Sequence, residues 1–154
     1  MPRLIGQTQV DADRKSSARK TTLWTVDLLR DAYSDMPNPQ GSILRKVLDW
    51  AVDNGYYIQT KTQFPSFGLR GRSGLRIVSI SSRYTYLLME EHRYPGGLEE
   101  LNTLLAELKE MRLVDPDILV EEVTSGRNLT RKLWELDERE LEKFLNLLDR
   151  YCAS

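Results

Sequence analysis

The residues best suited to chemistry are arginines and tyrosines that share the stretch 54–89. This stretch contains no Asp or Glu, although the chain as a whole carries a formal net charge of −1. An arginine can grip a phosphate with two parallel hydrogen bonds, and a tyrosine ring can stack on a base. The pattern therefore predicts a surface that contacts DNA or RNA. Its predicted contact residues are Lys61, Arg70, Arg72, Arg76, Arg83, Tyr84 and Tyr86.

A second basic segment lies at the start of the chain. Residues 1–20 show no sustained hydrophobic periodicity, and we expect them to form a flexible basic arm. Further phosphate contacts are predicted there for Arg14, Lys15, Arg19 and Lys20. Residues 1–97 carry 14 Lys and Arg against 9 Asp and Glu, whereas residues 98–154 carry 8 against 14. Such asymmetry indicates an electrostatic interaction surface.

Two other interpretations of this charge pattern stay open. Strands disfavour Asp and Glu, and positive charge on edge strands opposes aggregation, so sheet formation alone can also account for the basic stretch. The acidic C-terminal part supports an alternative function as a protein-interaction module. Such a module would bind a basic partner or a second copy of the chain through its helices or a sheet edge. The residues expected to face that partner are Glu99, Glu100, Glu107 and Glu110.

Catalytic residues are hard to find in this chain. Zinc sites normally take several Cys or His ligands, and the chain has one of each, Cys152 and His92. None of the serines lies in a nucleophile-elbow pattern. The acidic segment Asp115-Pro116-Asp117 is predicted to be a solvated turn, because the acid-x-Lys pair of a metal-dependent nuclease does not follow it. Whether this segment binds a metal stays open. The sequence thus favours a protein without enzymatic activity, and it predicts no cofactor.

The composition is that of one globular domain. The 154 residues are 40% hydrophobic and 29% charged, and no apolar run approaches the roughly 20 residues that cross a bilayer. A single cysteine excludes an internal disulfide and fits a reducing compartment. We therefore expect a cytoplasmic protein without membrane contact, in which residues 21–154 form the domain.

Two helices are predicted at the start of this domain. The first runs from a cap at Thr21 or Thr22 to about Ser34, and the segment DMPNPQG then interrupts it. Ser42 is expected to cap the second helix, SILRKVLDWAVDN. Gly55 follows this helix, and we expect it to end the helix in the left-handed conformation that glycine favours.

An antiparallel meander of three or four strands is predicted next. The first strand is predicted to start at Tyr56-Tyr57-Ile58 and to be ended by Pro65, and the other strand candidates are SFGLRG, LRIVSIS and YTYLLME. The turns between them are too short for a parallel crossover, so neighbouring strands must be antiparallel. The segment LRIVSIS has apolar residues at the positions of both faces of a strand: Leu75 and Ile77 on one face, and Val78 and Ile80 on the other. We therefore expect part of the sheet to be covered on both faces.

The C-terminal part is predicted to supply two helices that pack on the sheet. The segment GLEELNTLLAELKEMR carries leucines at helical spacing. A short strand is expected within VDPDILVEEVTSGRN, residues 114–128, and an edge strand from Lys132 to Leu136. Asp137 and Glu140 have the spacing of a capping box at the start of DERELEKFLNLLDRYC. The element order predicts the class α+β: two N-terminal helices, the meander and two C-terminal helices.

The chain from about Ile43 to Tyr151 also resembles a domain that recurs in uncharacterised bacterial proteins. The matching segments are a helix ending in VLDWA, the motif PSFGL, a meander, the helix LEELNTLLAEL, and a short strand leading into LEKFLNLLDRY. In that pattern the domain sometimes occurs beside nuclease-like or defence-associated regions. The resemblance implies the same fold and a role near nucleic-acid metabolism, and it transfers no catalytic residues.

Overall fold

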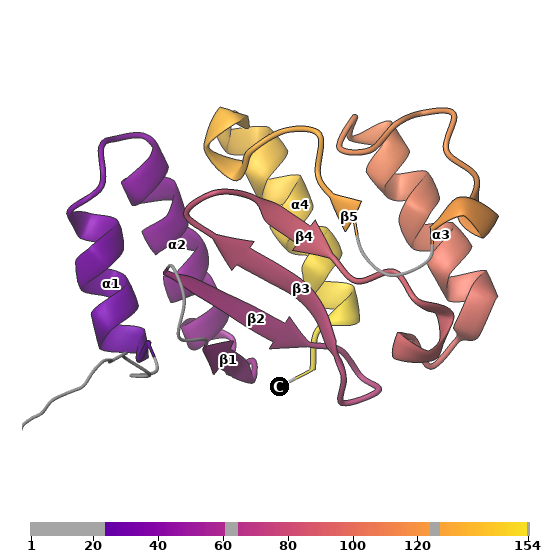
Figure 1. Ribbon diagram of the computed structural model, residues 1–154, viewed down its shortest axis with the longest axis horizontal. Helices are drawn as coiled ribbons and strands as arrows, with labels where there is room; N and C mark the ends of the chain where they lie inside the picture. The colour runs from indigo at the N-terminus through magenta and orange to yellow at the C-terminus, as the bar shows by residue number, and fades with distance from the viewer. Residues whose placement is uncertain (1–23, 61–64, 124–126, 154) are drawn as a thin grey trace, which may run out of the picture.

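The computed structural model describes residues 24–60, 65–123 and 127–153. Two helices precede an antiparallel sheet and two follow it (Figure 1), so the expected α+β class is confirmed. The helices and strands are α1 (Val26–Ser34), α2 (Gln40–Asp53), β1 (Ile58–Thr60), β2 (Ser66–Arg70), β3 (Arg76–Ser81), β4 (Thr85–Leu87), α3 (Gly97–Glu110), β5 (Arg127–Asn128) and α4 (Glu138–Tyr151). Three short 3-10 turns, η2 (Glu91–Arg93), η3 (Val120–Glu122) and η4 (Leu133–Glu135), lie between them.

The sheet is a meander of four strands to which β5 adds a short fifth. Its order is β1-β2-β3-β4-β5, so each strand pairs with the next one in the chain. Phe67 pairs with Ile80 and Leu69 pairs with Val78, which places these four side chains on the same side of the sheet. All four are fully buried. We call this side the core face.

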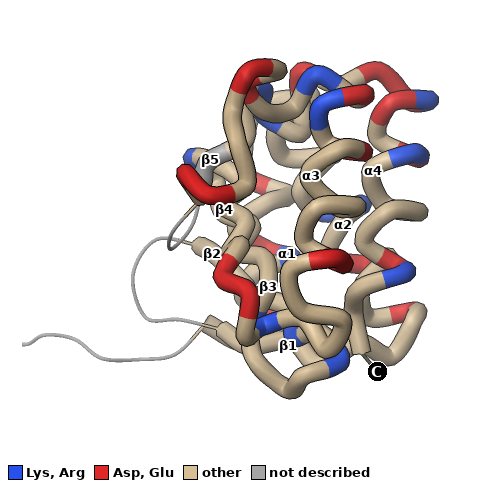
Figure 2. The backbone as a smooth tube through the Cα atoms, turned by 90° about the vertical axis from the view of Figure 1, so that its right-hand side faces the viewer, with Lys and Arg blue, Asp and Glu red and all other residues tan. Residues whose placement is uncertain are grey.

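The helices lie on the core face. In Figure 1, α2 and α4 run behind the sheet and α3 lies beside α4, and Figure 2 shows the strands and the pair α3 and α4 as separate layers. The leucines at helical spacing in α3, among them Leu105 and Leu108, are buried in one hydrophobic cluster with the strands. Within the described part of the chain, no helix crosses the opposite side of the sheet, which we call the open face.

A β-bulge between β2 and β3 breaks the alternation of side chains near the end of the hairpin. The register shifts between Leu69 and Arg70, and β3 has one additional residue, Ile77, at this point. Strict alternation from Val78 would direct Arg76 into the core and Ile77 away from it. The bulge exchanges the two: Ile77 is 1% exposed, and Arg76 lies on the open face.

The expectation that Leu75 and Ile77 cover a second face of the sheet is therefore wrong. Leu75 precedes β3, lies in the hairpin turn and is 41% exposed. Ile77 is apolar because the bulge turns it into the same core as Val78. Alternation along the sequence cannot reveal the bulge. One additional residue in a strand moves all residues beyond it to the opposite face.

The starts of the first two helices also differ from the prediction. Thr25, and not Thr21 or Thr22, caps α1, since its hydroxyl accepts a hydrogen bond from the backbone N–H of Leu28 at 3.2 Å. The second helix begins at Gln40, so Ser42 lies within its first turn and is not the cap. Its end is confirmed, because Gly55 has a φ of 72°.

The segment from Lys132 to Leu136 is not the expected edge strand. It contains the turn η4, whereas the short strand expected before it is confirmed as β5 beside β4. The capping box of α4 is confirmed as well: Asp137 accepts from the N–H of Glu140 at 2.7 Å, and Glu140 accepts from the N–H of Asp137 at 3.0 Å.

Candidate nucleic-acid interface on the open face

The open face combines small side chains, tyrosines and arginines. Gly68 of β2 pairs with Ser79 of β3, and Ser79 pairs with Tyr86 of β4, so these three residues form a row across the sheet. Gln59 of β1 continues the row on the other side of Gly68. No Asp or Glu occurs between residues 54 and 89, which include β1 to β4 and the turns that join them. The face is therefore polar and without negative charge along its strands.

Arg76, the first residue of β3, extends over this face. Its aliphatic stem crosses Gly68 so closely that a Cβ atom placed on residue 68 would lie 2.4 Å from Cδ of Arg76. A glycine inside a strand often marks such a close approach, and here the absent side chain makes room for the arginine. The guanidinium thus lies along the sheet and does not project from it.

Among the described residues, no carboxylate forms an ion pair with the guanidinium of Arg76. Its Nε is buried without a hydrogen-bond partner in the same part of the chain. Burial, and after it the positive charge of Arg93, lower the pKa of Arg76. Arg93 itself is held by Glu90, with Nε to Oε1 at 2.8 Å, and its Nη1 donates to the backbone carbonyl of Arg76 at 2.9 Å.

A half-buried cation beside a second cation is energetically unfavourable unless an anion compensates it. For Arg76, the groups that act on its charge are Arg93 and the phenol of Tyr86, and neither is a carboxylate. An anion from outside the described residues would satisfy both the free Nε–H and the charge. Phosphate has the geometry that a guanidinium binds best, because two of its oxygens accept from two N–H groups at once.

Aromatic rings lie on both sides of Arg76. The rings of Tyr84 and Tyr86 have centroids 6.2 Å apart and are tilted by 57°. At the other edge, Tyr57 precedes β1 and is 51% exposed, and Cζ of Arg70 lies 3.9 Å from the centre of its ring. The structure thus places four of the predicted contact residues, Arg70, Arg76, Tyr84 and Tyr86, on two neighbouring hairpins of one sheet.

Arg72 has a different environment. It extends from the β2–β3 turn to α3, where its Nη2 forms an ion pair with Glu100, whose side chain is only 13% exposed. Glu100 also accepts from the N–H of Gly96 at 2.8 Å. Ser73 adds a hydrogen bond from its hydroxyl to the carbonyl of Arg93 at 2.7 Å. These contacts attach the tip of the hairpin to the start of α3.

The remaining predicted contact residues are placed less completely. Arg83 lies in the turn between β3 and β4, where its carbonyl accepts a hydrogen bond from Nζ of Lys132. Lys61 and the arm residues Arg14, Lys15, Arg19 and Lys20 lie outside the described residues.

The glutamates expected to face a protein partner are divided between internal and exposed positions. Glu100 pairs with Arg72, and Glu107 accepts from Nη2 of Arg150. Glu99 and Glu110 are exposed. Two of the four side chains therefore already neutralise arginines of the same chain.

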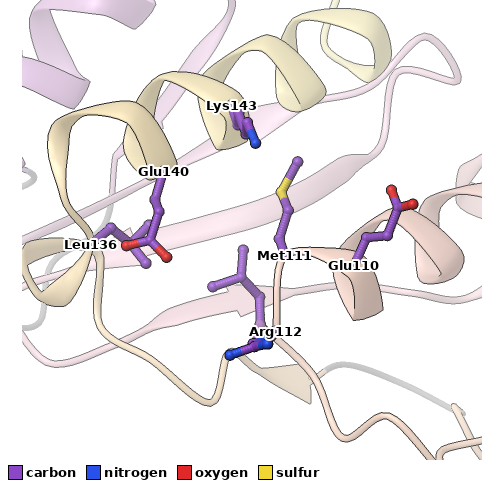
Figure 3. Close-up of a pocket in the computed structure, with 7 residues that line it drawn as sticks. Glu110, Met111, Arg112, Leu136, Glu140 and Lys143 are labelled. Atoms are coloured by element: carbon purple, nitrogen blue, oxygen red, sulfur yellow. The ribbon is translucent and has the colours of Figure 1, made fainter.

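A pocket of about 540 Å³ lies between the end of α3 and the start of α4 (Figure 3). Arg112 and Lys143 line it together with Glu110 and Glu140, so the pocket carries charges of both signs. The guanidinium of Arg131 binds Glu140 through two hydrogen bonds of 2.8 and 2.9 Å, and this lowers the pKa of Glu140 to about 2. Because these charges balance one another, the pocket selects no particular charge of ligand.

The acidic turn is held by its own hydrogen bond. Asp115 accepts from the backbone N–H of Asp117 at 3.0 Å, which is the geometry expected when an aspartate begins a turn. In the described ranges, no three or more His, Cys, Asp or Glu side chains lie close enough together to hold a metal ion.

Sequence reasoning missed three residues of the open face: Tyr57, Gly68 and Gln59. Gly68 carries a signal that could have been used, because an isolated glycine in a strand pattern indicates a bulge or a close contact. Tyr57 and Gln59 carry none, since their side of the sheet depends on the register of β1 with β2.

Comparisons with protein families, curated proteins and solved structures find no match to this chain. The resemblance to a recurring bacterial domain therefore stays a prediction. No helix among the described residues has the length and apolar character needed to cross a membrane.

Proposed function

We propose that this chain is a nucleic-acid-associated accessory protein that binds phosphate and bases on the open face of its sheet. The observation that carries the proposal is Arg76, a half-buried guanidinium on Gly68 without a counter-anion. Arg76 would bind a phosphate, Arg70 would add a second positive charge, and the tyrosines on either side would contact bases. A cytoplasmic location, where nucleic acid is present, fits this role.

The proposed role is binding without catalysis. Burial raises the pKa of the Cys152 thiol to about 12, which opposes formation of a nucleophilic thiolate. His92, the one histidine, is exposed in the turn η2, and no predicted nucleophile accompanies it. Basic and aromatic side chains on a flat sheet are sufficient for binding and require neither a metal nor a cofactor.

The proposal is tested by fluorescence anisotropy with labelled DNA and RNA of about 20 nucleotides, in single-stranded and duplex form, from about 25 to 300 mM salt. We expect Arg76→Ala to weaken binding about tenfold and to reduce the slope of log K against log salt by roughly one, because one phosphate contact is lost. Arg70→Glu should weaken binding as well. Arg70 is changed alone, because a change at Arg72 would also break the ion pair with Glu100.

The matched control is Arg139→Ala. Arg139 is an exposed arginine on α4, so its loss changes the net charge by the same amount as Arg76→Ala but leaves the open face intact. Equal losses for the two variants would show that only overall charge matters and would reject the open face as the site. Absence of binding at the lowest salt would reject the function itself and leave the protein-interaction alternative, which co-purification from the native host would then examine.

A further inference from the structure

We infer that the open face takes single-stranded nucleic acid and does not take a duplex. The inference rests on the proposed function and concerns the form of its ligand. Three observations support it: the width of the face, the depth at which Arg76 lies, and the position of the aromatic rings.

The open face is too broad for a groove of duplex DNA. Its contact residues extend from Tyr57, beside β1, to Tyr86 on β4, which is three strand spacings or roughly 14 Å. The major groove is about 12 Å wide and admits a helix or a ribbon of two strands. A face formed by four strands cannot enter it, so the base edges of a duplex would not reach these side chains.

The cation lies low on the face. The stem of Arg76 fills the space over Gly68, and its Nε is buried. The phosphates of a duplex follow a rigid cylinder, which cannot adapt to a guanidinium whose stem lies against the sheet. A single strand is flexible, and its backbone can follow the surface down to a recessed guanidinium.

The rings of Tyr57 and Tyr86 offer stacking surfaces. A base inside a duplex is already stacked on both sides, so a tyrosine can stack only on a base that has left the double helix. Tyr86 lies in the row of Gly68 and Ser79, and its phenol acts electrostatically on Arg76. A nucleotide with its phosphate on Arg76 would therefore have a tyrosine beside it. Tyr57 provides a second ring at the other edge, already covered by Arg70 on one side.

The test compares one sequence of about 12 nucleotides as single-stranded DNA, single-stranded RNA and duplex DNA. We expect the two single strands to bind at least about tenfold more tightly than the duplex. Tyr86→Ala should lower single-strand affinity about tenfold. Tyr86→Leu keeps the bulk of the side chain but not the ring, so it should lower the affinity about as much. Tyr86→Phe keeps the ring, so its affinity should stay within about twofold of the original. Thermal unfolding of each variant confirms that the sheet is intact.

The outcomes separate the inference from the function on which it rests. Duplex binding as tight as single-strand binding, still weakened by Arg76→Ala, would overturn the single-strand inference and leave the proposed function standing. Full affinity in both Tyr86→Ala and Tyr86→Leu would overturn the stacking argument and with it the inference. No binding to any of the three probes would overturn both. A homodimer in sedimentation that dissociates on Tyr86→Ala would instead assign the open face to a second copy of the chain.

Discussion

The two faces of the sheet are formed by the same strands yet follow opposite rules. On the core face, Phe67 and Leu69 are fully buried under the helices. Between them in the chain, Gly68 points the other way and supports Arg76 on the open face. Residues one position apart thus serve burial on one side and, in our proposal, contact with an anion on the other. Substitutions on the core face should therefore lower stability, and substitutions on the open face should lower nucleic-acid binding.

The largest effect is expected from the core face. Phe67→Ala removes a fully buried ring and leaves a cavity, so we expect it to lower the free energy of unfolding by about 3–5 kcal/mol. Ser79→Ala, on β3 of the open face, serves as the control and should change it by no more than about 0.5 kcal/mol. Urea denaturation at pH 7 measures both. Similar losses in the two variants would show that the faces do not differ as described.

A smaller effect tests whether the bulge exchanges neighbouring residues between the faces. Ile77→Ala should cost roughly 2–4 kcal/mol, because the bulge turns this residue into the core. Arg76→Ala should leave stability nearly unchanged, since the change removes a half-buried cation without a counter-charge. The pair is compared by chemical denaturation, with nucleic-acid affinity recorded in parallel. If Arg76→Ala lowered the free energy of unfolding strongly and Ile77→Ala lowered it little, Arg76 would lie on the core face and Ile77 on the open face, contrary to the structure.

The smallest effect concerns neither face of the sheet, and it is an effect on stability at low pH. Arg131 and the N-terminal turn of α4 hold the pKa of Glu140 at about 2, below its usual value of 4.5. Because the pKa is lower in the folded state, the stabilisation is complete above about pH 4.5 and is lost as the pH falls towards 2. Glu140→Gln should therefore narrow the difference in stability between pH 7 and pH 3. Urea midpoints at the two pH values measure this difference. If Glu140→Gln left the difference unchanged, the lowered pKa of Glu140 would be contradicted.

Much of the fold could be predicted from the sequence because its signals are local. The leucine spacing of α3, the capping box at Asp137 and the glycine that ends α2 each depend on residues within a few positions of one another. The short turns of the meander leave only an antiparallel arrangement. Fold class and element order followed from such signals.

The missed features depend on contacts between distant residues. The ion pair joins Arg72 in a turn to Glu100 in α3, 28 positions later in the chain, and no local pattern indicates it. The bulge is set by pairing between β2 and β3, so the side on which Arg76 lies could not be counted from β3 alone. The sequence therefore predicted which residue types make up the candidate site but not which of them share a face.

The bulge at Ile77 also determines which changes in the gene this hairpin can tolerate. Loss of the single codon for Ile77 would restore regular pairing next to Leu69 and Val78, and Arg76, now directly before Val78, would stay opposite Arg70 on the open face. Such an in-frame deletion therefore removes one residue of the core and leaves the cation of the open face in place. Among related chains, we therefore expect insertions and deletions in this hairpin to gather in the turns or at the bulge, where the loss of a residue leaves the pairing of its neighbours regular.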